Sequence, residues 1–227
     1  MTSAERSPQP GPTPSVVDTL RDAIAAGEFS PNQRLVEADL SEQFEASRAA
    51  VRSALLELTS EGLVERVQNR GARVRAVSLD EAVEITEVRM VLEGLVAAKA
   101  ATRLSGTDRD RLCAIGESME EAVASGDLLG YSELNKELHS LIRAAGEQET
   151  ASRILERLRG QSVRHQFRLA MHPGRPSVSL PQHLAIIEAL LAGDAERAEA
   201  AMRAHLQSVV DTLPEVGNTA VRPVPRG

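Results

Sequence analysis

Aromatic residues are nearly absent from this chain: they make up 2% of its 227 residues, with no Trp and one Tyr. Because strand-rich folds draw on aromatic and β-branched side chains, this scarcity argues against a mainly β protein. The abundant Ala, Leu, Glu and Arg favour helices instead. Apolar residues still make up 42% of the chain, enough to bury a sizeable core.

Cysteine and long apolar runs are also lacking. The single cysteine, Cys113, excludes an intramolecular disulfide framework and fits a reducing cytoplasm, and we expect it to be a small buried core residue. No apolar run approaches the roughly 20 residues that a membrane-spanning helix needs. The polar, proline-rich start lacks the apolar stretch of a signal peptide. We therefore expect a cytoplasmic protein without a membrane partner.

Positive charge is in deficit overall but is concentrated in one segment. The net charge is −7, yet residues 47–75 hold six arginines against three glutamates. A basic patch on an acidic body suits a protein that docks one face on nucleic acid, although a solvated charged surface would have the same composition.

The hydrophobic pattern divides the chain into two domains between proline-rich ends. Residues 1–14 and 214–227 have the composition of disordered tails. Residues 15–77 show three helical stretches, after which the period changes to two in residues 72–76, where small apolar residues alternate with arginines. Three helices followed by a β-hairpin indicate a winged helix-turn-helix. Residues 78–213 contain only helical stretches, at about 78–104, 107–125, 127–145, 148–171, 179–192 and 194–212. Their short connections predict an all-α antiparallel bundle, so the fold class is mainly α.

The third helix of the first domain has the features of a DNA-recognition helix. Ser47 is a suitable N-cap, and Arg48 and Arg52 lie four residues apart on a face turned away from the apolar side. Arginine can bind guanine edges or phosphates, and small residues admit a thymine methyl or a close backbone approach. The predicted DNA-binding residues on the helix and on the loop of the hairpin are Ser47, Arg48, Ala49, Ala50, Arg52, Asn69, Arg70 and Gly71.

The first domain resembles the DNA-binding domain of GntR-family transcriptional regulators over about 60 residues. The matching runs are Leu20-Arg21-Asp22-Ala23-Ile24, Gly27-Glu28, residues 34–40, Ser47-Arg48 with Val51-Arg52, residues 61–64 and residues 69–72. Two departures are local: the family usually has Gly where Asn32 stands and Thr-Pro where Ala49-Ala50 stand. The resemblance implies the mode of docking but leaves the operator sequence open.

The second domain resembles the helical effector domain, called FCD, of the FadR-like branch of that family. The residues that match are Val88-Arg89, Leu92-Glu93, Asn135, His139, His183, Ile186, Ala189, Gly193-Asp194, Ala198, Met202 and His205-Leu206. The resemblance implies a homodimeric regulator, commonly a repressor, that binds a double-stranded, pseudo-palindromic operator and responds to a metabolite. By the same resemblance Arg89 is a candidate for binding a small carboxylate effector, and a salt bridge with Glu93 is the alternative.

Spacing along the predicted helices places four polar side chains where they can converge. Asn135 and His139 share one helix face. His183 lies ten residues before Gly193 and His205 twelve after it, so in a hairpin turning at Gly193 they rise ~15 and ~18 Å and reach nearly the same level. Three imidazoles and an amide oxygen suit a divalent transition metal such as Zn, Ni or Mn, whereas each histidine alone would usually be a core residue with satisfied hydrogen bonds. The FCD resemblance supports the metal, although the family most often has Asp where Asn135 stands.

Functions of other classes remain as alternatives. A helical-bundle metalloenzyme is disfavoured because no histidine is preceded three residues earlier by Glu, and His-Glu-x-x-His, Gly-x-Ser-x-Gly, P-loop and dinucleotide motifs are lacking. We therefore expect no catalytic residues. An effector-independent DNA-binding dimer is the second alternative.

Overall fold

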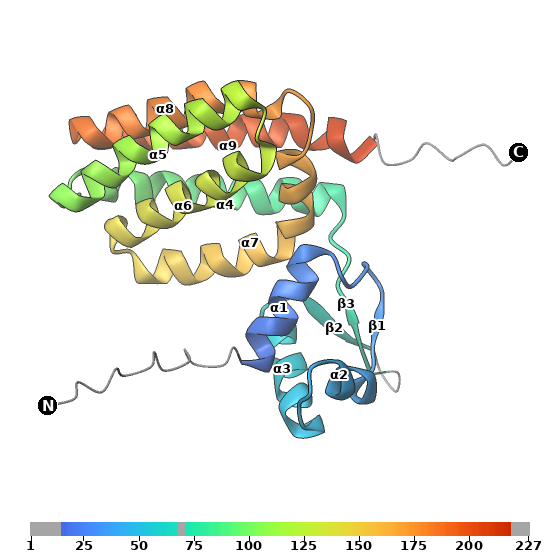
Figure 1. Cartoon of the computed structure of the whole chain (residues 1–227). Coiled ribbons are helices and arrows are strands. Elements are labelled where there is room, and N and C mark those ends of the chain that lie inside the picture. The colour runs from blue at the N-terminus through green and yellow to red at the C-terminus, as the bar shows by residue number, and fades with distance from the viewer. Residues whose placement is uncertain (1–14, 68–70, 219–227) are drawn as a thin grey trace, which may run out of the picture. The chain divides into compact units, whose positions relative to one another are not determined.

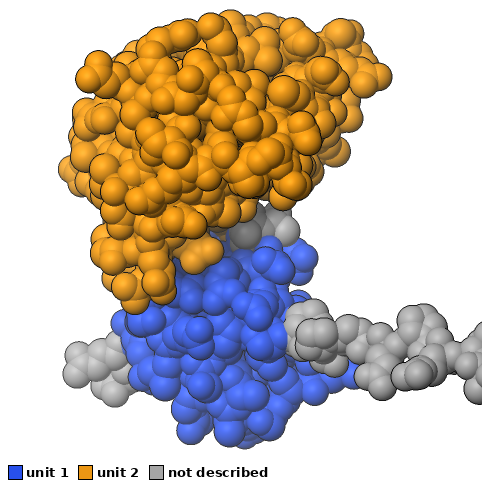
Figure 2. Space-filling model, turned by 90° about the vertical axis from the view of Figure 1, so that its left-hand side faces the viewer, with its two compact units in different colours: residues 1–76 blue, residues 77–227 orange. Residues whose placement is uncertain are grey.

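The computed structural model describes residues 15–67 and 71–218 of the chain. The chain forms two compact units, Met1–Ala76 and Val77–Gly227 (Figures 1 and 2). The first combines three helices with a small antiparallel sheet, and the second is helical throughout its described residues. The predicted fold class, mainly α with a winged helix-turn-helix and a helical bundle, is confirmed.

Local sequence signals set the helices of the first unit. Helix α1 (Val16–Ala26) starts at Ser15, whose hydroxyl accepts a hydrogen bond from the backbone N–H of Asp18, and it ends at Gly27 with φ +87°. Helices α2 (Glu37–Gln43) and α3 (Arg48–Ser60) follow. The three helices bury one shared apolar core, which includes Leu20, Ile24, Leu40, Val51, Leu55 and Leu58.

A three-stranded sheet completes the first unit. Strands β2 (Val64–Val67) and β3 (Gly71–Val74) form the predicted hairpin, with Val64 opposite Val74. The sheet order is β1-β3-β2 because a two-residue strand, β1 (Arg34–Leu35), pairs with the free edge of β3. Strand β1 was not predicted from the sequence, since two residues are too few to show an alternating pattern. The predicted loop residues 68–70 lie outside the described part of the chain.

The second unit is built around its first helix. Helix α4 (Leu79–Ala101) packs against α6 (Leu128–Gly146), α7 (Glu149–Ala170), α8 (Arg175–Ala192) and α9 (Ala195–Asn218), while α5 (Gly106–Ser125) packs on α6 and α8. Figure 1 shows α8 and α9 lying across the view with α4 along the same axis, and α5 inclined to them. The buried core of this unit is made of Leu, Ile, Met and Ala side chains from α4, α5, α6, α7, α8 and α9.

Three details of the second unit differ from the sequence analysis. Helix α8 starts at Arg175, earlier than residue 179, because Pro176 falls in its first turn, where a backbone N–H has no helical partner to lose. Helix α9 continues through Pro214 to Asn218, so the predicted disordered tail does not begin at residue 214; the preceding Leu213 is buried. Cys113 is exposed, not buried, because α5 turns Leu112 and Met119 inward and leaves Cys113 on the solvent side.

Within the described ranges, no helix is both long and apolar enough to cross a bilayer.

Candidate functional site

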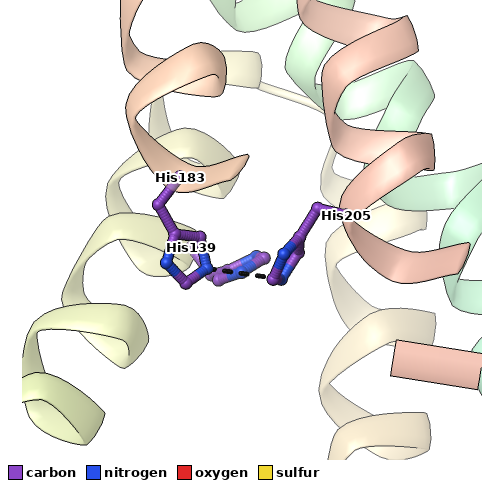
Figure 3. Close-up of side chains that lie close together, drawn as sticks. All are labelled: His139, His183 and His205. Carbon is purple, nitrogen blue, oxygen red and sulfur yellow. Dashed lines mark hydrogen bonds between the residues drawn. The ribbon is translucent and has the colours of Figure 1, made fainter. Parts of the chain in front are cut away.

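Three histidines from separate helices meet in the interior of the second unit. His139 comes from α6, His183 from α8 and His205 from α9, and each is at most 4% exposed. The ring centroids of His183 and His205 are 4.4 Å apart, and the ligand nitrogens of all three rings lie within 4.8 Å of one another (Figure 3). The expected hairpin explains this convergence, because α8 ends at Gly193 with φ +72° and α9 runs back along it.

The other nitrogen of each ring has its own neighbour. The Nδ1 atom of His183 lies 2.8 Å from the Tyr131 hydroxyl, and Nδ1 of His205 lies 3.0 Å from Oε1 of Gln182. Nδ1 of His139 lies 2.7 Å from Oε2 of Glu93, a close contact that does not meet the geometry of a hydrogen bond. Nε2 of His183 and Nε2 of His205 face each other at 3.3 Å. Each ring therefore has a polar neighbour on its Nδ1 side, and its Nε2 atom is available to a shared ligand.

Asn135 adds an oxygen to this group. It lies one helical turn before His139 on α6 and lines the same cavity as the three histidines. Its Oδ1 atom is buried and has no hydrogen-bond partner among the described residues. A buried amide oxygen without a partner is costly, so its presence fits a ligand bound at this point. Three imidazole nitrogens and one oxygen are donors that a divalent transition metal accepts.

Burial keeps the cluster neutral. It lowers the pKa of His139, and it lowers the pKa of His183 and of His205 well below the usual range. Burial alone would raise the pKa of the Glu93 carboxyl, but the Arg89 guanidinium and the His139 ring outweigh it, so that pKa lies well below its usual value. The histidines are therefore neutral near pH 7, the form in which an imidazole binds a metal.

Arg89 lies at the edge of the same cavity and is paired inside the protein. Its Nε and Nη2 atoms lie 2.9 and 2.8 Å from Oε1 of Glu93, one turn along α4, and both side chains are at most 5% exposed. The structure therefore contains the salt bridge that the sequence analysis gave as an alternative. Arg89 nonetheless lines the cavity, so its pairing with Glu93 leaves it accessible from the cavity.

Two arginines of this cavity were missed by sequence reasoning. Arg159 from α7 and Arg175 from the first turn of α8 line it together with the histidines. The only signal for Arg175 was its place after the His172-Pro173-Gly174 break, where a charged residue usually faces solvent. Arg159 lies in a helix with many arginines, and its spacing alone did not mark it.

The predicted recognition helix is exposed at its N-terminal end. Ser47 caps α3, since its hydroxyl accepts a hydrogen bond from the Ala50 backbone N–H at 3.1 Å. Arg48 and Ala49 are exposed and Ala50 is half-buried. The Arg52 side chain is 60% exposed, and its Nη2 lies 2.7 Å from the Glu37 carboxylate on α2.

Further arginines lie around Arg52. A pocket is lined by Arg34, Arg52 and Arg66 together with Glu37 and Gly71. Arg34 was not among the predicted site residues, because the strand that presents it is too short to be recognised in the sequence. Gly71, a predicted site residue, is exposed at the start of β3 with φ +85°, whereas Asn69 and Arg70 lie outside the described residues.

Comparison with protein families gives matches to both units. The description "Bacterial regulatory proteins, gntR family" matches residues 12–74, and "FCD domain" matches residues 84–208. The curated relatives include the HTH-type transcriptional repressor RspR of Escherichia coli, 27% identical over 87% of this chain and 86% of that protein. The HTH-type transcriptional regulator LutR of Bacillus subtilis is 29% identical over 84% of this chain and 95% of that protein.

Solved structures share the fold. E. coli McbR/YncC superposes with a TM-score of 0.76 at 23% identity, covering 88% of this chain and 95% of that one. A Rhodococcus protein described as a putative transcriptional regulator GntR has a TM-score of 0.67 at 22% identity, over 88% and 96% of the two chains. With an exposed, arginine-bearing helix in the first unit and a buried polar cavity in the second, the chain belongs to the GntR family of transcriptional regulators, in the group that carries an FCD domain.

Proposed function

We propose that this regulator binds a pseudo-palindromic operator as a homodimer and that a small organic acid in the helical unit controls this binding. Its site of action is the bacterial cytoplasm, where the chromosome lies. The observation that supports the proposal most strongly is the cavity around His139, His183 and His205, because its wall holds buried polar groups without a partner, such as Oδ1 of Asn135, which are costly unless a ligand uses them.

A divalent metal such as Zn, Ni or Mn is part of this proposal. The Nε2 atoms of the three histidines and Oδ1 of Asn135 are the donors that would hold it. When bound, the metal supplies positive charge that attracts a carboxylate oxygen of the effector. Arg89 lies on the cavity wall and is a further candidate contact for that acid, with Glu93 holding its guanidinium in place.

DNA binding is assigned to α3 and the hairpin. The residues proposed to contact DNA are Ser47, Arg48, Ala49, Ala50, Arg52, Asn69, Arg70 and Gly71. Arg48 and Arg52 are exposed on one face of α3, as groove contacts require. In the free protein the Arg52 guanidinium is hydrogen-bonded to the Glu37 carboxylate. When Arg52 binds a base or a phosphate, this new contact replaces the one with Glu37.

The dimer has a candidate surface on α4. Val88, Val91 and Leu95 follow one another at helical spacing and are 49%, 50% and 40% exposed. An exposed apolar stripe on a helix is typical of a surface that packs against another chain. Two copies joined this way would present two recognition helices to an operator with two half-sites.

Control by the effector follows from linkage. If the acid binds more tightly to one arrangement of the dimer than to the other, acid and operator alter each other's affinity by the same factor. We propose repression relieved by the acid as the direction of the response. The relatives named as repressors include RspR, which supports this choice.

The test of DNA binding starts with operator selection from a random DNA library using the full-length protein. Arg52→Ala should reduce affinity for the selected operator by tenfold or more, as expected for loss of a base or phosphate contact. Arg153→Ala, which removes an exposed arginine of α7, has the same charge change and should bind normally. Normal operator binding by Arg52→Ala would refute the assignment of α3.

The test of the cavity measures metal content and thermal stability with Zn²⁺, Ni²⁺ and Mn²⁺. His205→Ala should abolish stoichiometric metal binding and the associated rise in melting temperature. His172→Ala removes a histidine outside the cluster and should keep both. Equal metal content in His205→Ala and the unmodified protein would exclude this cluster as the site.

A further inference from the structure

Arg175 lines the cavity, and part of its guanidinium has no hydrogen-bond partner among the described residues. It is 6% exposed, and its Nη1 donates hydrogen bonds to Oγ of Ser208 at 2.8 Å and Oγ1 of Thr212 at 3.3 Å. Its Nη2 is buried and has no hydrogen-bond partner among the described residues. Neutral hydroxyls on α9 therefore fix the side chain, while Nη2 remains available to a bound ligand.

Arg159 faces the same cavity from α7. Within the described ranges its side chain has neither an ion pair nor a hydrogen bond, and the carboxylate that influences it, Glu93, is already engaged by Arg89 and His139. Burial lowers the pKa of Arg159 to about 10, so it remains charged near pH 7. A half-buried guanidinium without an acidic partner favours an anion beside it.

The charges around the cavity do not cancel. Arg89 and Glu93 form an ion pair with each other and neutralise each other. Among the lining residues no carboxylate is present, so Arg159 and Arg175 contribute two positive charges without a negative one. A ligand with two negative groups gives each of these two guanidinium groups an acidic partner, whereas a ligand with one leaves a guanidinium unpaired.

The size of the cavity limits the ligand. Its volume of about 70 Å³ has room for about five water molecules, which suits a short acid without a bulky group. Neutral donors and acceptors on its wall can bind the middle of such a ligand, and apolar side chains can pack on its carbon chain. The neutral polar wall residues are Tyr131, Ser132, Gln166 and Ser179, and the apolar ones include Leu169, Leu206 and Val209.

We propose that the cavity binds a short dicarboxylate, with Arg175 as the anchor of one carboxylate and Arg159 as the partner of the other. Each guanidinium presents a planar fork of donors that matches a carboxylate, and the two forks come from different helices. Arg175 and Arg159 thereby determine the charge of the effector. This assignment rests on the proposed function of the cavity as the effector site.

The test is a calorimetric titration of the full-length protein, with and without Zn²⁺, with the unbranched four-, five- and six-carbon dicarboxylates. Each is compared with the monocarboxylate of equal length and with inorganic phosphate. Because each charged hydrogen bond contributes roughly a factor of ten, at least one dicarboxylate should bind about tenfold or more tightly than its monocarboxylate and than phosphate. Equal binding of the two acids, or tighter binding of phosphate, would overturn the proposal.

Variants assign the two ends. Arg159→Gln should remove the preference for two carboxylates and keep the affinity for the monocarboxylate. Arg175→Gln should weaken both acids about tenfold or more. Because Arg175 also joins α8 to α9, Arg175→Gln could disturb folding. Arg175→Lys is therefore the second variant, which keeps the positive charge but loses the planar set of guanidinium donors. Arg157→Gln and Arg168→Gln, at exposed positions of α7, are the matched controls and should bind like the unmodified protein.

The outcomes separate this inference from the proposed function. Unchanged dicarboxylate binding in both Arg159→Gln and Arg175→Lys refutes the two-arginine site, even if an acid still alters operator affinity. If the dicarboxylate binds through these arginines and operator affinity stays constant, the site stands and effector control fails.

Discussion

The imidazole of His183 lies between two polar neighbours. The hydroxyl of Tyr131 is 2.8 Å from its Nδ1, and Nε2 of His205 is 3.3 Å from its Nε2. The Tyr131 hydroxyl also lies 2.8 Å from Oγ of Ser179, and burial raises its pKa to about 12. The tyrosine therefore stays protonated and can hold the ring in one orientation. Metal ligands depend on such partners for their orientation and basicity.

Tyr131→Phe should weaken metal binding by roughly tenfold or more, because the His183 ring loses the neighbour that orients it. A competition titration with a chromophoric chelator would measure the change. Ser140→Ala, at an exposed position of α6, is the control and should bind metal normally. An unchanged metal affinity in Tyr131→Phe would mean that the hydroxyl has no part in orienting His183.

Asn135→Asp should increase the affinity for a divalent metal, because a carboxylate is a stronger ligand than a neutral amide. Asn135→Leu should decrease it, since the oxygen is lost. The same chelator competition gives both values, and melting temperatures in metal-free buffer separate ligand effects from folding effects. If neither substitution alters the affinity, the buried Oδ1 of Asn135 has another partner.

The sequence carried enough information for the histidine cluster because helical geometry is regular. Counting residues on either side of Gly193 placed His183 and His205 at one level, and the centroid distance of 4.4 Å confirms that placement. Asn32 is a similar case in the first unit. The family usually has Gly there, and the observed φ of +64° is a conformation that Asn tolerates better than most residues.

Features that depend on tertiary packing could not be predicted in this way. Arg175 looked like a loop residue after Gly174, and only the seating of α8 on α9 turns it inward. Strand β1 exists because β3 has a free edge beside it, not because of any pattern in Arg34-Leu35. The contact between His139 and Glu93 joins α6 to α4, and residue spacing within one helix carries no such information.

Arg89→Met should destabilise the protein by about 3–5 kcal/mol, because it leaves the buried Glu93 carboxylate without its strongest partner. Urea denaturation of the metal-free protein would measure the loss. The control is Arg197→Met, which breaks an ion pair with Glu188 at an exposed position and should destabilise the protein far less, because solvent screens that pair. Similar losses in the two variants would show that the Arg89–Glu93 pair is not desolvated in solution.

Gly146→Ala tests the close packing of α6 on α4 that brings His139 into the core. A Cβ at Gly146 would lie 2.8 Å from Cγ1 and 2.9 Å from the carbonyl oxygen of Val96, and the backbone atom has little freedom to move. The substitution should therefore destabilise the protein by about 1–3 kcal/mol, as overpacking does. The carbonyl of Gly146 also accepts a hydrogen bond from Nη1 of Arg103 at 2.7 Å, which a shift of the helix end would weaken.

Gly106→Ala is the matched control for that substitution. Gly106 starts α5, and a Cβ there meets no atom within 4 Å. Alanine should therefore leave the stability of the protein unchanged or raise it by about 0.4–1 kcal/mol, because it lowers the conformational entropy of the unfolded chain. The difference between the two variants in urea denaturation isolates the contact with Val96 from the general effect of replacing glycine. If both variants had the same stability, α6 would not approach α4 this closely. Alternatively, the backbone at Val96 would be able to shift away from the new Cβ, although Val96 is buried in the core.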